Sequence, residues 1–262
     1  MRIIAGPCQH ESLEQSLEIA RECKRVCDQL DIDYIFKASF DKANRTSMKG
    51  QRGKGLDVTL EAFRTMKLEI AGLQTLTDVH DTKQVYLIKE NYNDAVDILQ
   101  IPAFLCRQTD ILLASAKTNK VVNIKKGQFL APSDIKHAIN KVTSEGNVET
   151  WITERGTTFG YGNLVVDMRS IPIMKKTGCP VIIDASHGIQ LPSANGEQSS
   201  GQIEFLPTIA KSAISAGADG LFLETHPNPQ EAISDKDSQL PLKKFPNLVE
   251  ECIRLWRFTN NK

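Results

Sequence analysis

Short apolar segments alternate with longer segments of helical period along the full length of the chain. The apolar segments predict strands at residues 2–5, 33–38, 73–77, 97–101, 121–125, 149–153, 180–184 and 220–224. Between and after them, apolar residues recur three and four positions apart, which predicts helices at residues 12–30, 56–71, 82–90, 109–117, 133–143, 166–176, 204–216 and 245–257. Ser12 suits the N-cap of the first helix, and Gly72 suits the end of the second.

Eight strand–helix units in a chain of 262 residues predict an α/β fold, a closed parallel (β/α)8 barrel or TIM barrel. A doubly wound open sheet is the alternative. The chain has no linker, low-complexity tract or internal repeat at the sequence level, so we expect residues 1–262 to form a single domain.

Polar side chains follow every predicted strand, where the catalytic face of such a barrel lies. They are Cys8, Lys37, Asp78 with His80, Gln100, Lys125 with Lys126, Arg155, His187, and Glu224 with His226. Together they predict a polar, partly cationic pocket, although any one of them could be an ordinary residue of a barrel mouth. Two long loops, 186–202 and 226–242, are expected at the same face. The first has the composition of a mobile lid, and structural loops can share it.

The stretch 36–54 is strongly basic in a chain whose charges otherwise balance. It carries six basic residues against the single acid Asp41, and they are Lys37, Lys42, Arg45, Lys49, Arg52 and Lys54. Lysine and arginine, interleaved with neutral hydrogen-bonding side chains, suit phosphate or carboxylate groups. We therefore favour an anion site over a solvated basic loop.

Composition excludes several classes of function. With 32 basic and 32 acidic residues, nothing indicates nucleic acid or an anionic membrane as a partner. No apolar stretch approaches the roughly 20 residues that span a bilayer, and the first residues lack a signal-peptide core. The six cysteines are too dispersed for a disulfide framework, which predicts reduced thiols and a cytoplasmic location. Cys23 and Cys27 could form a metal pair, but buried cysteines usually act as small apolar residues.

Seven motifs resemble those of the 3-deoxy-D-manno-octulosonate 8-phosphate synthase family, nearly end to end. They are FKASFDKANRTS (36–47), TDVH (77–80), QIPAFLCRQTD (100–110), NIKKGQF (123–129), ERGTTFGYGNLVVDM (154–168), DASHG (184–188) and LFLETHPNP (221–229). The resemblance implies an enzyme that condenses phosphoenolpyruvate with D-arabinose 5-phosphate, releases phosphate and serves synthesis of the Kdo sugar of lipopolysaccharide. It also implies a homotetramer.

Three other functions stay open. The related 3-deoxy-D-arabino-heptulosonate 7-phosphate synthases use erythrose 4-phosphate and carry a KPRT-like segment where this chain has KANR at 42–45, which favours arabinose 5-phosphate. A lyase or epimerase acting on another phosphosugar is a second alternative. A non-catalytic phosphosugar-binding barrel is a third.

The resemblance also implies a metal-dependent enzyme. Metal-independent members resemble GGxN after the first strand, whereas this chain has Gly6-Pro7-Cys8. The implied ligands are Cys8, His187, Glu224 and Asp235, a mixed set that suits Zn²⁺, Fe²⁺ or Mn²⁺. Taken alone, His187 would more often be structural and Asp235 a solvated loop residue. The N-terminal hairpin often seen across the barrel base in this family is expected to be missing.

The resemblance assigns substrate roles residue by residue. Phosphoenolpyruvate would contact Lys37, Ser39, Lys42, Gln100, the backbone around Ala103, Lys125 and Arg155. Arabinose 5-phosphate would place its phosphate on Arg45 and Thr46, where Thr46 replaces the usual Ser, and its hydroxyls on Asn44 and Asp235. The implied catalytic residues are Lys42, Asn44, His187 and Asp235.

Overall fold

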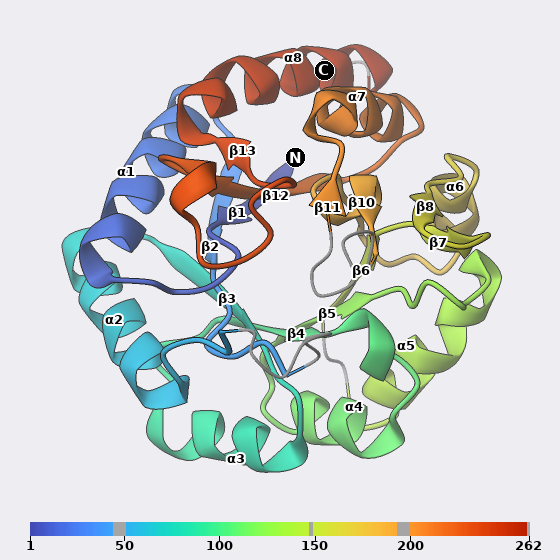
Figure 1. Cartoon of the computed structure of the whole chain (residues 1–262). Coiled ribbons are helices and arrows are strands. Elements are labelled where there is room, and N and C mark those ends of the chain that lie inside the picture. The colour runs from blue at the N-terminus through green and yellow to red at the C-terminus, as the bar shows by residue number, and fades with distance from the viewer. Residues whose placement is uncertain (44–50, 147–148, 193–199, 261–262) are drawn as a thin grey trace.

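The computed structural model describes residues 1–43, 51–146, 149–192 and 200–260. Within them, eight parallel strands pair in the order β1-β2-β3-β4-β5-β6-β9-β12, and β12 pairs back with β1 (Figure 1). These strands are β1 (Arg2–Gly6), β2 (Asp33–Lys37), β3 (Gln74–Asp78), β4 (Ile98–Ile101), β5 (Val121–Lys125), β6 (Thr150–Glu154), β9 (Val181–Asp184) and β12 (Gly220–His226). The sheet is closed, so the TIM-barrel prediction is confirmed and the open sheet is excluded.

Helices surround this barrel in the expected alternation (Figure 1). They are α1 (Leu13–Gln29), α2 (Leu56–Glu69), α3 (Thr82–Asn91), α4 (Thr109–Ala116), α5 (Ile135–Thr143), α6 (Ser170–Lys175), α7 (Leu206–Ser215) and α8 (Phe245–Thr259). Ser12 caps α1 as predicted, because its side-chain oxygen accepts a hydrogen bond from the backbone N–H of Gln15 at 3.2 Å. In this part of the chain, no helix is long and apolar enough to cross a membrane.

The sixth helix is shorter than predicted, since 166–169 lie before α6, with a turn at 168–169. The Asp167 carboxylate accepts a hydrogen bond from the backbone N–H of Arg169 at 3.0 Å, a local bond that competes with helix formation. The preceding residues form an unpredicted antiparallel hairpin of β7 (Thr157–Phe159) and β8 (Asn163–Val165). A second small pair joins β10 (Gln190–Leu191) to β11 (Ser200–Gly201), and β13 (Leu240–Pro241) extends the sheet beside β12.

Two apolar layers follow from the alternation of side chains along each strand. Ile3 points outward into the layer between barrel and helices, and Ile4 points inward. The inward layer consists of Ile4, Ile35, Leu76, Ile98, Trp151, Ile182 and Phe222. A residue two positions later shares the same inward face, which places Lys37, Asp78 and Glu224 above this layer, at the carboxyl ends of the strands.

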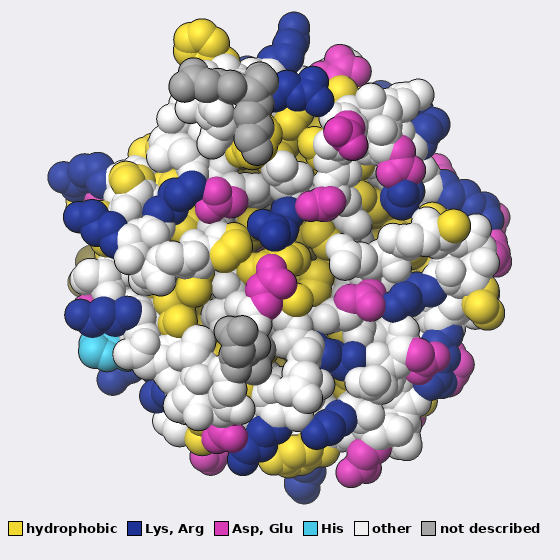
Figure 2. All heavy atoms as spheres, turned by 180° about the vertical axis from the view of Figure 1, so that it is seen from behind, with side chains coloured by type: hydrophobic (Ala, Val, Ile, Leu, Met, Phe, Trp, Pro, Cys, Tyr) yellow, Lys and Arg dark blue, Asp and Glu magenta, His cyan; other side chains and the backbone are white. Residues whose placement is uncertain are grey.

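Trp151 lies near the opposite, amino-terminal end of the barrel. Its indole N–H donates to the Glu149 carboxylate at 2.7 Å, and the Arg2 guanidinium lies 4.9 Å from the centre of its ring. Seen from behind, acidic and basic side chains are interspersed over the surface of the molecule (Figure 2). Such interspersed charges fit the balanced composition of the chain.

Candidate active site

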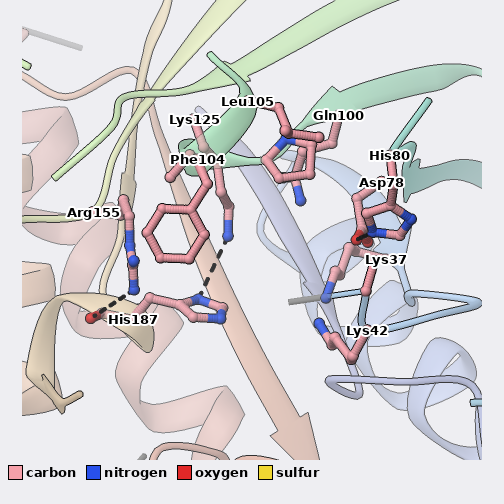
Figure 3. Close-up of a pocket in the computed structure, with 13 residues that line it drawn as sticks. Lys37, Lys42, Asp78, His80, Gln100, Phe104, Leu105, Lys125, Arg155 and His187 are labelled. Atoms are coloured by element: carbon pink, nitrogen blue, oxygen red, sulfur yellow. Dashed lines mark hydrogen bonds and ion pairs between the residues drawn. The ribbon is translucent and has the colours of Figure 1, made fainter. Parts of the chain in front are cut away.

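A cavity of about 260 Å³ opens among the carboxyl ends of the strands. Its walls include Lys37, Lys42, Asp78, His80, Gln100, Pro102, Ala103, Phe104, Lys125, Arg155 and His187 (Figure 3). Figure 3 shows Lys125, Arg155 and His187 on one side and Lys37, Lys42, Asp78 and His80 on the other. The cavity is therefore bordered by cationic groups from opposite sides of the barrel.

Lys37, in the cavity wall, forms a buried ion pair with Glu224. The Lys37 ammonium lies 3.0 Å from Glu224 Oε1 and donates to the Cys8 carbonyl at 3.0 Å. Burial alone would raise the pKa of Glu224, but the charges of Lys37 and His187 outweigh burial and lower it. Glu224 is therefore held as a carboxylate, and within the described part of the chain its Oε2 atom is buried without a hydrogen-bond partner.

Three further ligand groups lie around that carboxylate. One ligand atom each from Cys8, Glu224 and Asp235 lies within 4.8 Å of the others. The Cys8 sulfur is 2.9 Å from Asp235 Oδ2, and His187 Nε2 is 3.6 Å from Glu224 Oε1. Burial, together with the two neighbouring carboxylates, raises the pKa of the Cys8 thiol well above its usual range. A divalent cation would compensate the clustered negative charge and the unpaired Glu224 oxygen, so these residues fit such an ion.

Asp184 orients the histidine of this group. Its Oδ2 atom lies 2.7 Å from His187 Nδ1, and its Oδ1 atom accepts from the His187 backbone N–H at 2.9 Å. The carboxylate accepts the proton on Nδ1, so Nε2, which faces Glu224, is the nitrogen that would give its lone pair to a bound metal. The Lys125 ammonium also donates to Asp184 at 2.6 Å. Desolvation opposes the charge of Asp184, but His187 and Lys125 outweigh it and hold the pKa of that carboxyl well below its usual range.

Arg155 follows β6 and is positioned by the turn that comes after that strand. The Glu154 carboxylate accepts from the backbone N–H groups of Arg155 at 2.9 Å and of Gly156 at 2.7 Å. The Arg155 guanidinium donates to Gln190 Oε1 at 2.9 Å, while its Nε atom has no hydrogen-bond partner among the described residues. Burial lowers the pKa of both Arg155 and Lys125. An anion in the cavity would offset the burial of these two cations.

Lys42, Ser39, Asp78 and His80 form a hydrogen-bonded chain on the opposite wall. Lys42 Nζ donates to the Ser39 hydroxyl at 2.9 Å, Ser39 donates to Asp78, and Asp78 lies 3.0 Å from His80 Nε2. Desolvation opposes the charge of Lys42, but the anionic groups around it outweigh this effect and raise its pKa. This wall therefore presents a protonated amine to the cavity.

Comparison with known proteins identifies the family. Residues 1–256 match the model described as the DAHP synthetase I family. The chain belongs to this family.

Several similar proteins are named 2-dehydro-3-deoxyphosphooctonate aldolase. That of Caulobacter vibrioides is 51% identical over 254 residues, which cover 97% of this chain and 87% of the relative. That of Chelativorans sp. is 48% identical over 262 residues, covering 100% and 93%. That of Brucella anthropi is 50% identical over 251 residues, covering 96% and 89%.

For this family member, the structure brings together most of the residues predicted from sequence. Of the four predicted metal ligands, Cys8, Glu224 and Asp235 form one group, and His187 adjoins it through Glu224 without belonging to it. The cavity is lined by Lys37, Lys42, Gln100, Ala103, Lys125, Arg155 and His187. Ser39 contacts the cavity wall through Lys42 and Asp78. Gln100 also accepts from the Asn123 amide at 3.1 Å. Asn44, Arg45 and Thr46 lie outside the described residues.

Two of the polar residues that follow predicted strands, Lys126 and His226, lie outside both the cavity and the group of Cys8, Glu224 and Asp235. The Lys126 ammonium is buried and donates to the carbonyls of Gly127 at 3.2 Å and Leu130 at 3.3 Å. The His226 ring lies 2.9 Å from Gln15 Nε2, between β12 and α1. Lys126 comes directly after inward-facing Lys125 and so takes the other face of the backbone. His226 is the last residue of β12, where that strand pairs with β13. Cys23 and Cys27 are free thiols packed in the outer core, so the metal-pair alternative is not supported.

Sequence reasoning gave no individual role to Asp184, Gln190, Ser234 or Glu154, all of which contact site residues. The position of Asp184 offered a signal, because it comes two residues after inward-facing Ile182. Gln190 and Ser234 lie in the long loops, where no such periodicity applies.

Proposed function

We propose that the chain condenses phosphoenolpyruvate with D-arabinose 5-phosphate and water to give 3-deoxy-D-manno-octulosonate 8-phosphate and inorganic phosphate, a step towards the Kdo sugar of lipopolysaccharide. The observation that carries the proposal is a cation-lined cavity at the barrel mouth. It lies in a chain 51% identical over 254 residues to a protein named 2-dehydro-3-deoxyphosphooctonate aldolase.

Phosphoenolpyruvate would span the two cationic walls of the cavity. Lys125 and Arg155 are assigned to its phosphate, and the lowered pKa of each is the physical reason: a dianion would compensate cations that burial disfavours. Lys42 is assigned to the carboxylate side, with Lys37 behind it. Gln100 and the backbone at Ala103 would contact the enol ester from the wall between these groups.

Arabinose 5-phosphate would enter above phosphoenolpyruvate. Arg45 and Thr46 are assigned to its phosphate, and Asn44 and Asp235 to its hydroxyl groups. The enol carbon C3 then bonds to the aldehyde carbon, water adds its oxygen to C2, and the bond from C2 to the phosphate oxygen breaks. Holding the two carbons in contact is worth on the order of 7–11 kcal/mol at best.

The assigned catalytic residues act on the aldehyde end. Lys42 has a raised pKa and would stabilise the aldehyde oxygen as it gains negative charge. His187 and Asp235, together with Cys8 and Glu224, would hold a divalent Zn²⁺, Fe²⁺ or Mn²⁺ ion, and the enzyme would then be of the metal-dependent class. When bound, such an ion supplies Lewis-acid polarisation and can acidify a coordinated water.

Release of inorganic phosphate from phosphoenolpyruvate tests the proposal. We expect release with arabinose 5-phosphate, little with erythrose 4-phosphate, and none after chelation until Mn²⁺, Fe²⁺ or Zn²⁺ is restored. Erythrose 4-phosphate is included because the family model that matches the chain is described as the DAHP synthetase I family. Equal rates with both aldoses would reject the acceptor assignment. Affinity for both substrates without phosphate release would instead support a binding protein.

We also propose a homotetramer located in the cytoplasm. Large apolar side chains are exposed on the segments after β4, β5 and β6, namely Phe104, Phe129, Phe159 and Tyr161. Exposed large apolar side chains on neighbouring segments are candidates for subunit contacts. Light scattering should give four times the 29.1 kDa of the chain, and a monomer would reject the assembly. All six cysteines are free thiols, which supports a reducing compartment.

A further inference from the structure

Gln190 bridges two parts of the candidate site that come from different barrel units. Its side-chain oxygen accepts a hydrogen bond from Arg155 Nη2 at 2.9 Å. Its side-chain nitrogen donates to Asp235 Oδ1 at 2.8 Å. Only 7% of Gln190 is exposed, and its bond to Arg155 is buried. One amide therefore connects the cation after β6 to the carboxylate in the loop after β12.

The chemistry of the two partners requires this orientation of the amide. A guanidinium has only donors, and an ionised carboxylate has only acceptors. The oxygen of Gln190 must therefore face Arg155, and its nitrogen must face Asp235. A carboxylate at position 190 could not donate to Asp235, and an apolar side chain could satisfy neither partner.

The backbone around Gln190 is joined to the same loop. Gln190 pairs with Gly201 in the β10–β11 hairpin, and a Cβ atom on Gly201 would lie 2.8 Å from the Asp237 carbonyl oxygen. The Ser200 hydroxyl donates to the Asp237 carboxylate at 2.9 Å. Asp235 itself has a φ of 51°, a conformation that costs energy for a residue with a side chain. Contacts from the hairpin therefore help to hold Asp235 in place.

We propose that Gln190 is a positioning residue that sets the orientation of Arg155 relative to Asp235, and so couples the phosphate end of the site to its metal end. This inference rests on the proposed function, in which Arg155 binds the phosphate of phosphoenolpyruvate and Asp235 is a metal ligand. Gln190 acts through these two side chains and needs no contact with either ligand.

Gln190→Met tests the bridge, because methionine has a similar length and cannot make either hydrogen bond. Mn²⁺ affinity, followed by electron paramagnetic resonance without substrates, should fall about 10- to 100-fold, the usual effect of removing a group that orients a metal ligand. Affinity for phosphoenolpyruvate, measured by calorimetry, should fall about tenfold. In an Arg155→Met background, Gln190→Met should change phosphoenolpyruvate affinity less than about twofold, because the partner is already absent.

Gln15→Met is the matched control. Gln15 is partly buried and, like Gln190, joins two elements through its amide, which contacts His226 at 2.9 Å, but it lies outside the cavity. We expect it to leave both affinities unchanged. Gln190→Asn, one methylene shorter, should reproduce the losses if the methionine variant does not fold.

The two proposals fail in distinguishable ways. A wild-type protein that binds neither Mn²⁺ nor phosphoenolpyruvate would overturn the proposed function and this inference with it. A wild-type protein that binds both, with folded Gln190 variants that bind them equally well, would overturn the inference alone. If Gln190→Met lowered phosphoenolpyruvate affinity equally in the presence and absence of Arg155, Gln190 would support only the fold. That result would also overturn the inference.

Discussion

Replacing Asp184 by asparagine keeps the shape of the side chain and removes the charge that organises one wall of the site. The Asp184 carboxylate accepts from Lys125 Nζ at 2.6 Å, from His187 Nδ1 at 2.7 Å and from the His187 backbone N–H at 2.9 Å. An asparagine has only one acceptor oxygen. Whichever way the amide is turned, its NH₂ group faces at least one other donor.

The expected effect on stability is large, because Asp184 and Lys125 are both buried. Removing one partner of a buried ion pair typically costs about 3–5 kcal/mol, since the remaining charge has no compensation. The effect on metal binding has a separate origin. Without a carboxylate on Nδ1, His187 is no longer held with Nε2 directed to Glu224, and we expect Mn²⁺ affinity to fall about 10- to 100-fold.

Urea denaturation and Mn²⁺ titration measure the two effects separately. Asp219→Asn is the matched control, because Asp219 also pairs with a lysine, Lys175 at 2.7 Å, and accepts from the Val181 backbone N–H at 2.9 Å. Its side chain is 31% exposed, however, so the loss of its ion pair should cost at most about 1 kcal/mol and leave Mn²⁺ affinity unchanged.

Two results would refute this reasoning. A folded Asp184→Asn protein with wild-type Mn²⁺ affinity would show that Asp184 does not orient a metal ligand. Equal losses of unfolding free energy in the Asp184 and Asp219 variants would show that burial does not determine the cost.

Other substitutions test other parts of the argument. Cys8→Ala should abolish metal content and turnover together, whereas Cys8→Asn should keep some activity that resists chelators. Metal content above half of wild type in the Cys8→Ala protein would contradict the ligand assignment. Gly6→Ala should cost about 1–3 kcal/mol in urea denaturation, because its Cβ would lie 2.0 Å from a backbone oxygen of β2, and wild-type stability would contradict that contact. Arg45→Ala should raise KM for arabinose 5-phosphate far more than KM for phosphoenolpyruvate, whereas an equal rise would indicate a general effect on the loop. Burial opposes the charge of His80, but its hydrogen bond to Asp78 outweighs burial and raises the pKa of His80. This pair therefore stabilises the fold fully below about pH 6.5, and the stabilisation is lost as the pH rises through the raised pKa of His80. The stability difference between wild type and His80→Asn should therefore shrink from pH 5.5 to pH 9, and a constant difference would exclude that linkage.

The sequence determined the barrel itself. Each apolar segment was short and bounded by a helical segment, and neighbouring parallel strands can bury such segments on both faces only when helices cover the outside. The location of the site at the carboxyl ends of the strands followed from the same pattern. The basic stretch that begins at Lys37 also indicated anions before any contact was known.

Only the tertiary structure decided which polar residues face the cavity. Lys125 and Lys126 are adjacent in sequence and equally charged, yet one lines the cavity and the other binds backbone carbonyls of the segment that follows β5. Glu224 and His226 both follow an apolar strand, but β12 extends through His226 because β13 pairs with it. Whether a polar side chain faces the inside of the barrel depends on where the strand ends. That end point is set by pairing with residues that are distant in sequence.

The loops depended on tertiary structure most of all. Asp235 could be proposed as a ligand from family resemblance, but its bond to Gln190 arises because two loops from neighbouring barrel units meet. The same holds for the 2.9 Å contact of Cys8 with Asp235, which are 227 positions apart. Local periodicity describes how each segment buries its own apolar face. It carries no information on contacts between polar side chains that closure of the barrel brings together, because those contacts depend on the positions of the elements in space.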